Sequence, residues 1–326
     1  MNKHASRHFL SISQLSSDGL SGLLRLAAEL RAETPAPGIL QGKSVVLIFE
    51  KPSVRTRVTF EVAVHRLGGW PVLLGPEESR LGARECISDL AANLSQWADC
   101  LVARVFRHQD IEELSAFASI PVVNALSDVE HPCQALADML TLQDAWGNFR
   151  GRRLVYVGDW NNVSRSLWKA SVLAGLEFRA ICPEAYGPDS SEAVEWSSDC
   201  NSIAGADAVY TDVWTSMGQE QEFEKRRVAF APYQVNERLM AKAGKSALFM
   251  HCLPAHRGME VTDAVIDSKR SLVLKQAANR LPVEMAVLTS LMEIHHEKPC
   301  QESRTRLYRR SRHLDNHSVA EGKLRV

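Results

Sequence analysis

The chain has 326 residues and a mass of 36.2 kDa, which is more than one typical hydrophobic core and predicts two domains. Its apolar content of 45% and charged content of 24% are those of an ordinary soluble globular protein. The net charge of −1 gives no indication of a nucleic-acid or membrane partner. No apolar run approaches the ~18 residues of a transmembrane helix, and the N-terminus lacks the apolar segment of a secretory signal.

The seven cysteines are odd in number and scattered, and no two of them form a Cys-x-x-Cys pair. This pattern is typical of reduced thiols rather than of a disulfide framework. We therefore expect a cytoplasmic protein.

Apolar, strand-like segments alternate with amphipathic, helix-like segments along almost the whole chain. Strands are predicted over 44–50, 70–75, 99–106, 120–126, 153–159, 176–182, 208–214 and 246–253. Helices are predicted over 54–67, 86–97, 110–118, 132–146, 161–174 and 233–243. This alternation is typical of an α/β fold with parallel sheets and right-handed crossovers. We expect two domains, each a parallel sheet flanked by helices, with the active site in the cleft between them.

The predicted strands divide into a group before residue 130 and a group after residue 150. We therefore expect a first domain over 1–147 and a second over 148–275, with a long helix over 276–296 that packs back on the first. From residue 298 onward, eight Lys/Arg residues stand against three Asp/Glu residues, without apolar periodicity. The segment 298–326 is therefore predicted to be a basic, disordered tail.

Polar clusters follow six of the predicted strands, whereas the strands themselves are apolar. Because ligands of open α/β sheets bind beyond the carboxyl ends of the strands, we expect these clusters to meet in one cleft. The clusters are Ser53–Arg57, Arg104, His131–Gln134, Asp159–Asn162, Asp212 with Ser216–Gly218, and His251–Gly258.

The first cluster has the composition of an anion site. Pro52 ends an apolar strand, and Ser53 stands at the N-cap of the next helix, beside Arg55 and Thr56. Backbone N–H groups, hydroxyls and a guanidinium are what a phosphate dianion requires. Taken alone, the segment is explained about equally well by an ordinary capped helix with solvated arginines.

Further donors favour a phosphate that carries a carbonyl group. Thr56, Arg104 and His131 can donate to a carbonyl oxygen, while Ser53 and Arg55 hold the phosphate. Taken alone, His131 is more often a structural residue at a helix start. In combination, the five residues predict an acyl-phosphate site.

Another set of residues suits an amino-acid head group. Asn161, Asn162, Asp212 and Ser216 offer amides for a carboxylate, and a carboxylate and a hydroxyl for an ammonium. The two asparagines are equally well explained as helix caps, but Asp212 lies in a predicted apolar strand and needs partners there. Cys252 can be a buried structural thiol, a metal ligand or a proton-handling group.

Metal and nucleotide chemistry are both disfavoured. A zinc site made from His251, Cys252 and His256 lacks the usual spacing and a clear fourth ligand. No dinucleotide-binding fingerprint follows Gly158, and the sequence contains no Walker A motif. We expect neither a metal nor a cofactor.

Four motifs, in this order along the chain, resemble those of the aspartate/ornithine carbamoyltransferase family. They are Phe49-Glu50-Lys51-Pro52-Ser53-x-Arg55-Thr56-Arg57, His131-Pro132-Cys133-Gln134, Asp212-Val213-Trp214-x-Ser216-Met217-Gly218 and His251-Cys252-Leu253-Pro254-Ala255-His256-Arg257-Gly258. The first two are similar to motifs of carbamoyltransferases in general, and the last two to motifs of the ornithine-specific members. The similarity runs from about residue 8 to 294.

The resemblance implies transfer of the carbamoyl group from carbamoyl phosphate to the δ-amino group of L-ornithine, giving L-citrulline and phosphate, in arginine-related metabolism. It also implies a homotrimer with shared active sites. The residues that would bind carbamoyl phosphate are Ser53, Val54 (through its backbone), Arg55, Thr56, Arg104, His131, Gln134, Cys252, Leu253 and Arg280. Those that would bind ornithine are Asn162, Asp212, Ser216 and Met217, and the catalytic set is Cys252, Asp212, Arg104 and His131.

The sequence departs from the family pattern in three places. Val54 stands where the family usually has Thr, and Arg80 where it usually has a Gln that reaches the neighbouring subunit's site. The basic tail also extends beyond the usual end. We expect activity to survive Val54, because the backbone amide remains and a hydroxyl–phosphate hydrogen bond contributes only ~1.5–3 kcal/mol.

Two other functions remain open at this point. One is a carbamoyltransferase for another amine, such as putrescine or an acylated ornithine. The other is a non-catalytic paralogue that serves as a binding subunit. The Asp212 and Ser216 pair favours an amine with an α-amino group, and the intact set of candidate catalytic residues favours an enzyme.

Overall fold

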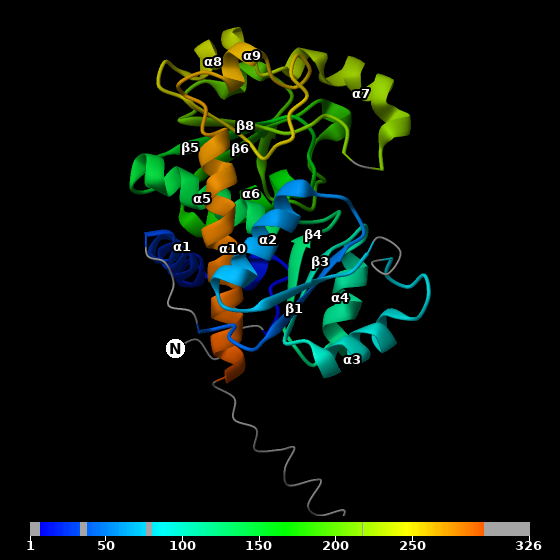
Figure 1. Ribbon diagram of the computed structural model, residues 1–326. Helices are drawn as coiled ribbons and strands as arrows, with labels where there is room; N and C mark the ends of the chain where they lie inside the picture. The colour runs from blue at the N-terminus through cyan, green and yellow to red at the C-terminus, as the bar shows by residue number, and fades with distance from the viewer. Residues whose placement is uncertain (1–6, 33–37, 76–79, 217, 297–326) are drawn as a thin grey trace, which may run out of the picture.

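The computed structural model describes residues 7–32, 38–75, 80–216 and 218–296. Within these ranges the chain forms two parallel β-sheets, one in the lower and one in the upper half of Figure 1, with helices packed against both. The predicted fold class is confirmed. The tail over 298–326 and Met217 lie outside the described residues.

The first sheet is built from residues 44–126. Its strands, in spatial order, are β2 (Trp70–Leu73), β1 (Ser44–Phe49), β3 (Cys100–Arg104) and β4 (Val122–Leu126). The connecting helices are α2 (Val54–Arg66), α3 (Ile87–Trp97) and α4 (His108–Phe117). All neighbouring strands are parallel, and every residue of β3 and β4 is buried, so these strands read as continuous apolar runs.

The second sheet is built from residues 153–251. Its strands, in spatial order, are β7 (Glu195–Ser197), β6 (Glu177–Ile181), β5 (Arg153–Val157), β8 (Ala208–Thr211) and β9 (Leu248–His251), all parallel. Its helices are α6 (Asn162–Ala174), α7 (Phe223–Phe230), α8 (Glu237–Ala243) and α9 (Asp263–Ile266). Short 3-10 helices cover Ile12–Gln14, Glu184–Tyr186, Cys200–Ile203, Glu220–Glu222 and Ala231–Tyr233.

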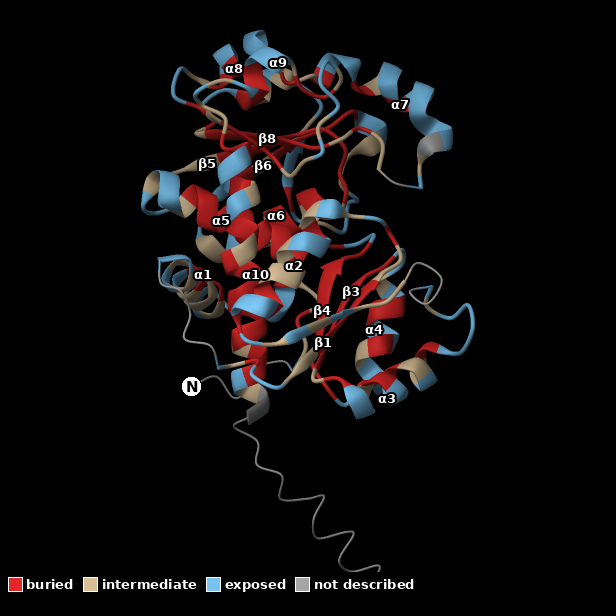
Figure 2. Ribbon diagram, viewed as in Figure 1, coloured by how far each residue is buried: buried red, intermediate tan, exposed pale blue. Residues whose placement is uncertain are grey.

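Three helices join the two sheets: α1 (Ser17–Ala32), α5 (Pro132–Trp146) and α10 (Val273–His296). The long helix α10 packs on α5, α1 and α2, and it also contacts β9, so it touches both halves of the molecule (Figure 1). Figure 2 shows that the strands and the inward faces of these helices are buried, whereas the outward helix faces are exposed.

A buried carboxylate strengthens this junction. Glu130, just before α5, accepts hydrogen bonds from Ser11 Oγ (2.5 Å) and the Ile12 N–H (3.0 Å) of the N-terminal segment. It also accepts from Ser166 Oγ (3.1 Å) and pairs with Lys169 Nζ (2.6 Å), both on α6. The Glu130 side chain therefore links the N-terminal segment to helix α6.

The structure differs from the predicted elements in several details. Strand β8 ends at Thr211, so Asp212 lies just beyond the strand and not inside it as predicted. Helix α8 begins at Glu237, because Asn236 caps it, and the preceding segment is a 3-10 helix. The predicted elements omit α1, β7, α7 and α9. Among the described helices, none is long and apolar enough to cross a membrane.

Candidate active site

A cavity of about 550 Å³ lies where the carboxyl ends of the two sheets face each other. Residues at or beyond the carboxyl ends of β1, β4, β5, β8 and β9 line it, together with Arg104 at the end of β3 and Arg280 on α10. The lining residues are Lys51, Pro52, Ser53, Val54, Arg55, Thr56, Arg104, Leu126, His131, Asn162, Val163, Asp212, Val213, Thr215, Ser216, Cys252, Leu253, Pro254, His256 and Arg280.

The start of helix α2 forms one wall of the cavity. Ser53 is the N-cap, and its Oγ accepts a hydrogen bond from the Thr56 N–H (3.3 Å). The first backbone N–H groups of a helix have no partner within the helix, and the helix dipole places positive potential there. Val54, at the first helical position, is 78% exposed and adds no hydroxyl to this wall.

Three arginines gather at this wall: Arg55, Arg104 and Arg280. Burial and the neighbouring charges of Arg280 and Arg55 lower the pKa of Arg104 to about 10. Burial and Arg280 likewise lower the pKa of Arg55. Burial is the main cause of these shifts and repulsion between the arginines adds to it; an anion placed between them would relieve that repulsion.

Arg280 is held on several sides by buried polar groups. Its guanidinium donates hydrogen bonds to Gln134 Oε1, to Thr56 Oγ1 (2.8 Å) and to Glu284 Oε1 (3.1 Å). Burial raises the pKa of Glu284 to about 7, although Arg280 opposes the shift. Gln134 therefore reaches the site through Arg280 and is not itself part of the cavity lining.

Several buried nitrogen atoms at the site have no hydrogen-bond partner among the described residues. They are Nε of Arg104, Nε of Arg280 and Nδ1 of His131. Burial and the charges of Arg280 and Arg104 hold the pKa of His131 well below its usual value, so the imidazole is neutral at neutral pH. The His131 backbone N–H donates to Ser166 Oγ (2.9 Å), which fixes the residue at the start of α5.

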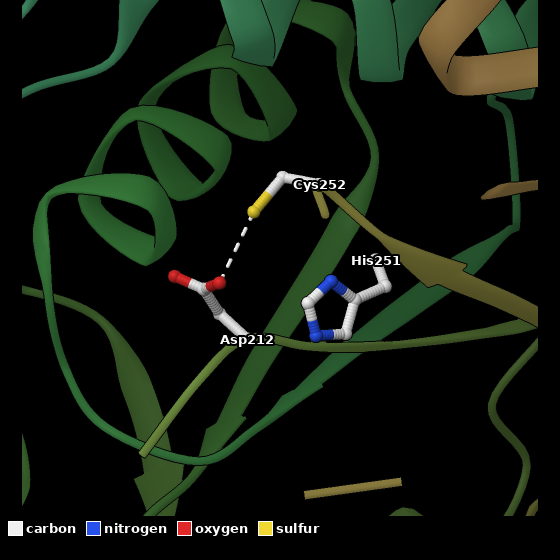
Figure 3. A group of neighbouring side chains, drawn as sticks. All are labelled: Asp212, His251 and Cys252. Carbon is white, nitrogen blue, oxygen red and sulfur yellow. Dashed lines mark hydrogen bonds between the residues drawn. The ribbon is translucent and has the colours of Figure 1, made fainter. Parts of the chain in front are cut away.

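Asp212 and Cys252 face the arginines from the second sheet. Figure 3 shows the Cys252 thiol directed at the Asp212 carboxylate, with Sγ 3.1 Å from Oδ1. The other carboxylate oxygen accepts from Asn161 Nδ2 (2.9 Å). Burial and the Asp212 charge raise the pKa of Cys252 well above its usual value, so the thiol is protonated at neutral pH.

His251, also drawn in Figure 3, lies within 4.8 Å of Asp212 and Cys252, measured between potential metal-ligand atoms. Its Nδ1 accepts from the Leu253 N–H (2.9 Å), and its Nε2 lies 3.2 Å from Glu260 Oε1. Both ring nitrogens are therefore engaged, and the imidazole has no lone pair left for a metal ion. Instead it holds Leu253, which has a left-handed backbone with φ of 58°.

Only some of the residues predicted to bind an amino acid line the cavity. Asn162 lines the cavity, but its Nδ2 donates to the Ser127 carbonyl (2.6 Å). Asn161 is the N-cap of α6, as its alternative interpretation held, and it also contacts Asp212. Ser216 lines the cavity. Asp159, which the sequence placed in the cleft as part of the same strand-end cluster, does not line the cavity. It pairs with Arg226 (2.9 Å), which also donates to the Trp214 carbonyl.

Lys51 and Thr215 line the cavity although they belong to none of the predicted clusters. Pro254 and His256 also line it; they lie in the predicted cluster His251–Gly258, which assigned them no binding role. For Lys51 a signal was available, since it lies inside the first motif. Its Nζ stands 4.9 Å from the centre of the Phe106 ring, and burial together with Arg104 lowers its pKa. It brings a further positive charge to the wall that carries the arginines.

Comparisons with known proteins agree with this geometry. Residues 7–144 match the family model of the aspartate/ornithine carbamoyltransferase carbamoyl-phosphate-binding domain, and residues 150–291 match that of the Asp/Orn-binding domain. An ornithine carbamoyltransferase from Shewanella oneidensis is 47% identical over 300 residues, which cover 87% of this chain and 99% of the relative.

Solved structures show the same similarity. Ornithine carbamoyltransferase from Pyrococcus furiosus superposes with a TM-score of 0.85 and 42% identity, over 90% of this chain and 99% of that one. Ornithine carbamoyltransferase from Thermus thermophilus superposes with a TM-score of 0.82 and 42% identity, over 88% of this chain and 99% of that one. The chain belongs to the aspartate/ornithine carbamoyltransferase family.

Proposed function

We propose that the chain is an ornithine carbamoyltransferase, which transfers the carbamoyl group of carbamoyl phosphate to the δ-amino group of L-ornithine and releases L-citrulline and phosphate. One observation carries the proposal: within a single cavity, a cluster of arginines at a helix N-terminus faces a buried carboxylate–thiol pair. The first suits an anion, and the second suits a cationic amine. The similarity to ornithine carbamoyltransferases over most of the chain supports the same function.

The phosphate group would lie at the start of α2. Ser53, the backbone of Val54, Arg55 and Thr56 supply hydroxyl, amide and guanidinium donors there. Electrostatic attraction is strong in this place because the positive charges are partly buried and already repel one another. A phosphate dianion would neutralise that repulsion.

The carbonyl oxygen of the carbamoyl group would face Arg104 and His131, with Thr56 nearby. Negative charge develops on this oxygen when the amine attacks, and fixed donors stabilise such charge most. The buried Arg104 Nε and His131 Nδ1 have no partner among the described residues, which supports this assignment. Gln134 and Arg280 would bind the same substrate, with Leu253 and Cys252 closing the site from the second sheet.

Ornithine would lie against Asp212 and Cys252, with Asn162 and Ser216 at its α-amino acid group. Met217 stays a predicted ligand, because it lies outside the described residues. The δ-ammonium must lose one proton before its nitrogen can attack, and the Asp212 carboxylate, which accepts a hydrogen bond from the Cys252 thiol, would receive that proton. The nitrogen then bonds to the carbamoyl carbon and the carbon–oxygen bond to phosphate breaks. The leaving phosphate takes the second proton of that nitrogen and departs.

The domain organisation fits the binding of one substrate by each domain. We assign carbamoyl phosphate to residues 1–147, joined by the helix over 276–296, and ornithine to residues 148–275. Binding of the anion between the two would favour closure, which would bring the amine within attack distance and exclude water.

We further propose a cytoplasmic homotrimer with shared active sites, without a cofactor or a nucleic-acid or membrane partner. Arg80 is exposed and is absent from the cavity lining of its own chain. The neighbouring Leu81 N–H donates to Glu50 Oε1 (2.9 Å), which anchors this loop beside the start of α2. Arg80 would reach the site of the adjacent subunit and add a positive charge there.

The test is a colorimetric assay for carbamoylated product with ornithine, putrescine and Nα-acetylornithine side by side. We expect product with ornithine at a kcat/KM at least about 100-fold above that for putrescine, since Ser216 and Asn162 lose their partners with the diamine. A higher kcat/KM for putrescine or for Nα-acetylornithine would show that this amine, and not ornithine, is the substrate. Binding of carbamoyl phosphate without product from any amine would indicate a non-catalytic binding subunit.

A further inference from the structure

One face of helix α6 lies along the turn over residues 127–131, which joins β4 to α5. Asn162 Nδ2 donates to the Ser127 carbonyl (2.6 Å) at the start of this turn. At its end, the His131 N–H donates to Ser166 Oγ (2.9 Å). Asn162 and Ser166 are four positions apart, so they lie one above the other on the helix. Helix α6 therefore holds both ends of a turn that carries one residue of the cavity lining, His131.

The Ser166 hydroxyl is bonded both as a donor and as an acceptor. Ser166 is fully buried, and its proton is donated to Glu130 Oε2 (3.1 Å). A hydroxyl has one proton and two lone pairs, so the lone pairs remain for the His131 N–H. On the same helix, Ser171 shows the ordinary alternative, because its Oγ donates to the Leu167 carbonyl (2.8 Å) one turn earlier. A carboxylate is a stronger acceptor than a carbonyl, and it keeps the Ser166 proton away from that direction.

Glu130 is itself held firmly in place. Its side chain is 1% exposed, and its Oε1 accepts from Lys169 Nζ (2.6 Å) and Ser11 Oγ (2.5 Å). Its Oε2, which accepts from Ser166, also accepts the Ile12 N–H (3.0 Å). Rotation of the carboxylate would leave a buried donor without a partner, which is unfavourable. The direction of the Ser166 hydroxyl is therefore fixed by the surrounding structure.

The backbone of His131 determines where its imidazole lies. His131 is the N-cap of α5, and Pro132 follows it and restricts its backbone conformation. The His131 side chain makes no capping hydrogen bond, and its buried Nδ1 has no partner among the described residues. The ring is thus not anchored through Nδ1, and the backbone contact with Ser166 contributes to its placement.

We propose that Ser166 is a positioning residue of the active site, whose hydroxyl, oriented by Glu130, holds the His131 backbone so that the imidazole faces the carbamoyl oxygen. The inference rests on the proposed function, which assigns His131 to that oxygen. Ser166 is not part of the cavity lining, so it touches no substrate position itself.

Loss of the hydroxyl should displace the imidazole. The buried His131 N–H would have no acceptor, and the start of α5 would shift to find one. A displacement of about 1 Å at a group that acts on the reacting atoms can cost ~100-fold in rate. The phosphate group, which is assigned to the start of α2, should be bound as before.

The first test is Ser166→Ala in steady-state kinetics, well below its melting temperature. We expect kcat to fall roughly 10- to 100-fold, with the KM for ornithine within about threefold. Ser171→Ala is the matched control, because Ser171 is on the same helix, is fully buried and bonds only a carbonyl of that helix. Its kcat should stay within about twofold of the parent. A kcat within about twofold of the parent in Ser166→Ala would overturn the proposal.

The second test uses two ligands and needs no turnover. Phosphonoacetamide carries a phosphonate and a carboxamide, whereas methylphosphonate carries the phosphonate alone. In calorimetry, Ser166→Ala should bind phosphonoacetamide roughly fivefold more weakly than the parent and methylphosphonate about equally well. Equal losses for both ligands would indicate general damage to the site and would overturn the proposal.

A double-mutant cycle asks whether Ser166 acts through His131. In the His131→Ala background, which lacks the imidazole, Ser166→Ala should lower kcat by no more than about twofold further. Independent, multiplicative losses would mean that Ser166 acts on some other group, and the proposal would fail.

Glu130→Gln decides the matter if Ser166→Ala does not fold. The amide has one acceptor oxygen for the four donors that the carboxylate binds, so the Ser166 hydroxyl loses its fixed direction. A selective loss of affinity for phosphonoacetamide supports the proposal, and unchanged affinity together with an unchanged kcat overturns it.

Failure of the proposed function would look different. A parent that forms no citrulline would refute that function, whatever the variants do. The comparison of phosphonoacetamide with methylphosphonate would still show whether Ser166 positions the group that binds the carboxamide.

Discussion

The two walls of the cavity are built differently. At the first sheet, the residues behind the start of α2 are buried and bonded to one another: Arg280, Thr56 and His131 are at most 5% exposed, and Arg280 donates to two buried side chains. At the second sheet the residues that face them are less buried, since Cys252 and Ser216 are only partly buried. An exception is Asp212, which is 5% exposed and held by Asn161.

The difference in burial between the two walls affects the free energy with which each substrate binds. Desolvation of the buried cations takes place when the protein folds, so a phosphate that binds them finds its donors already oriented. We expect the amine wall to gain more of its order when the substrate binds, because Cys252 and Ser216 are only partly buried. This contrast favours binding of carbamoyl phosphate before ornithine, and substitutions on the two walls should separate the two substrates.

The largest effect is expected for Arg280→Met. The variant loses a phosphate-side cation and leaves the buried Glu284 without its ion-pair partner, so activity should fall at least ~100-fold and the free energy of unfolding should fall by about 3–5 kcal/mol. Activity within about threefold of the parent would contradict the contrast between the walls.

The pH dependence of this loss of stability has a definite sign. Burial raises the pKa of Glu284 to about 7, so folding favours its protonated form. Stability from this group is complete below the pKa of the unfolded chain and is lost as the pH rises through about 7. Without Arg280 the pKa rises further, and the deficit relative to the parent should grow between pH 5 and 8, as measured by thermal unfolding. Adding Glu284→Gln to Arg280→Met should restore stability but not activity.

A smaller and more selective effect is expected for Asp212→Asn. The amide cannot receive the amine proton or attract the ammonium, so kcat/KM for ornithine should fall roughly 100-fold, while carbamoyl-phosphate affinity, measured by calorimetry, stays within about twofold. Asp207→Asn is the control, because Asp207 precedes β8 just as Asp212 follows it, and it pairs with Arg152 (2.8 Å) at the opposite end of the strand. An equal loss of affinity for both substrates in Asp212→Asn would show that the two walls are not separable.

The smallest effect is expected for Val54→Thr. A new hydroxyl at the first turn of α2 should lower the KM for carbamoyl phosphate roughly tenfold, as one hydrogen bond to a charged group does. The melting temperature should not change, because Val54 is 78% exposed. Val58→Thr, one turn along and 50% exposed, lies off the cavity lining and should change neither value. An inactive parent revived by Val54→Thr would refute the expectation that activity tolerates Val54.

The carboxyl-end clusters could be predicted because they depend on local sequence and on one rule of parallel sheets. Ser53 at the start of a helix, Arg104 at a strand end and His131 before Pro132 are all visible within a few residues of an apolar run. Parallel pairing then brings them to the same edge, as the register of Phe49 opposite Arg104 illustrates. No knowledge of distant contacts is needed.

The buried carboxylate of Asp138 on α5, and the hydrogen bonds it accepts from Tyr210 and Gln276, could not be predicted in this way. Its partners Tyr210 and Gln276 lie 72 and 138 residues further along the chain. In the sequence, Asp138 is one polar residue in an amphipathic helix, where a solvated side chain is the ordinary interpretation. The position of Asp212 was misjudged for a related reason: a strand end is set by pairing with its neighbours, and β8 pairs only as far as Thr211.

Helix α10 has a consequence for the order in which the protein is made. It carries Arg280, which completes a site whose other phosphate-side residues lie before residue 135. A nascent chain that has released both sheets still lacks this cation until nearly the whole sequence has been synthesised. Full affinity for the anion therefore arises late in biosynthesis, and a chain that ends before α10 should bind carbamoyl phosphate much more weakly than the full chain, even with every strand in place.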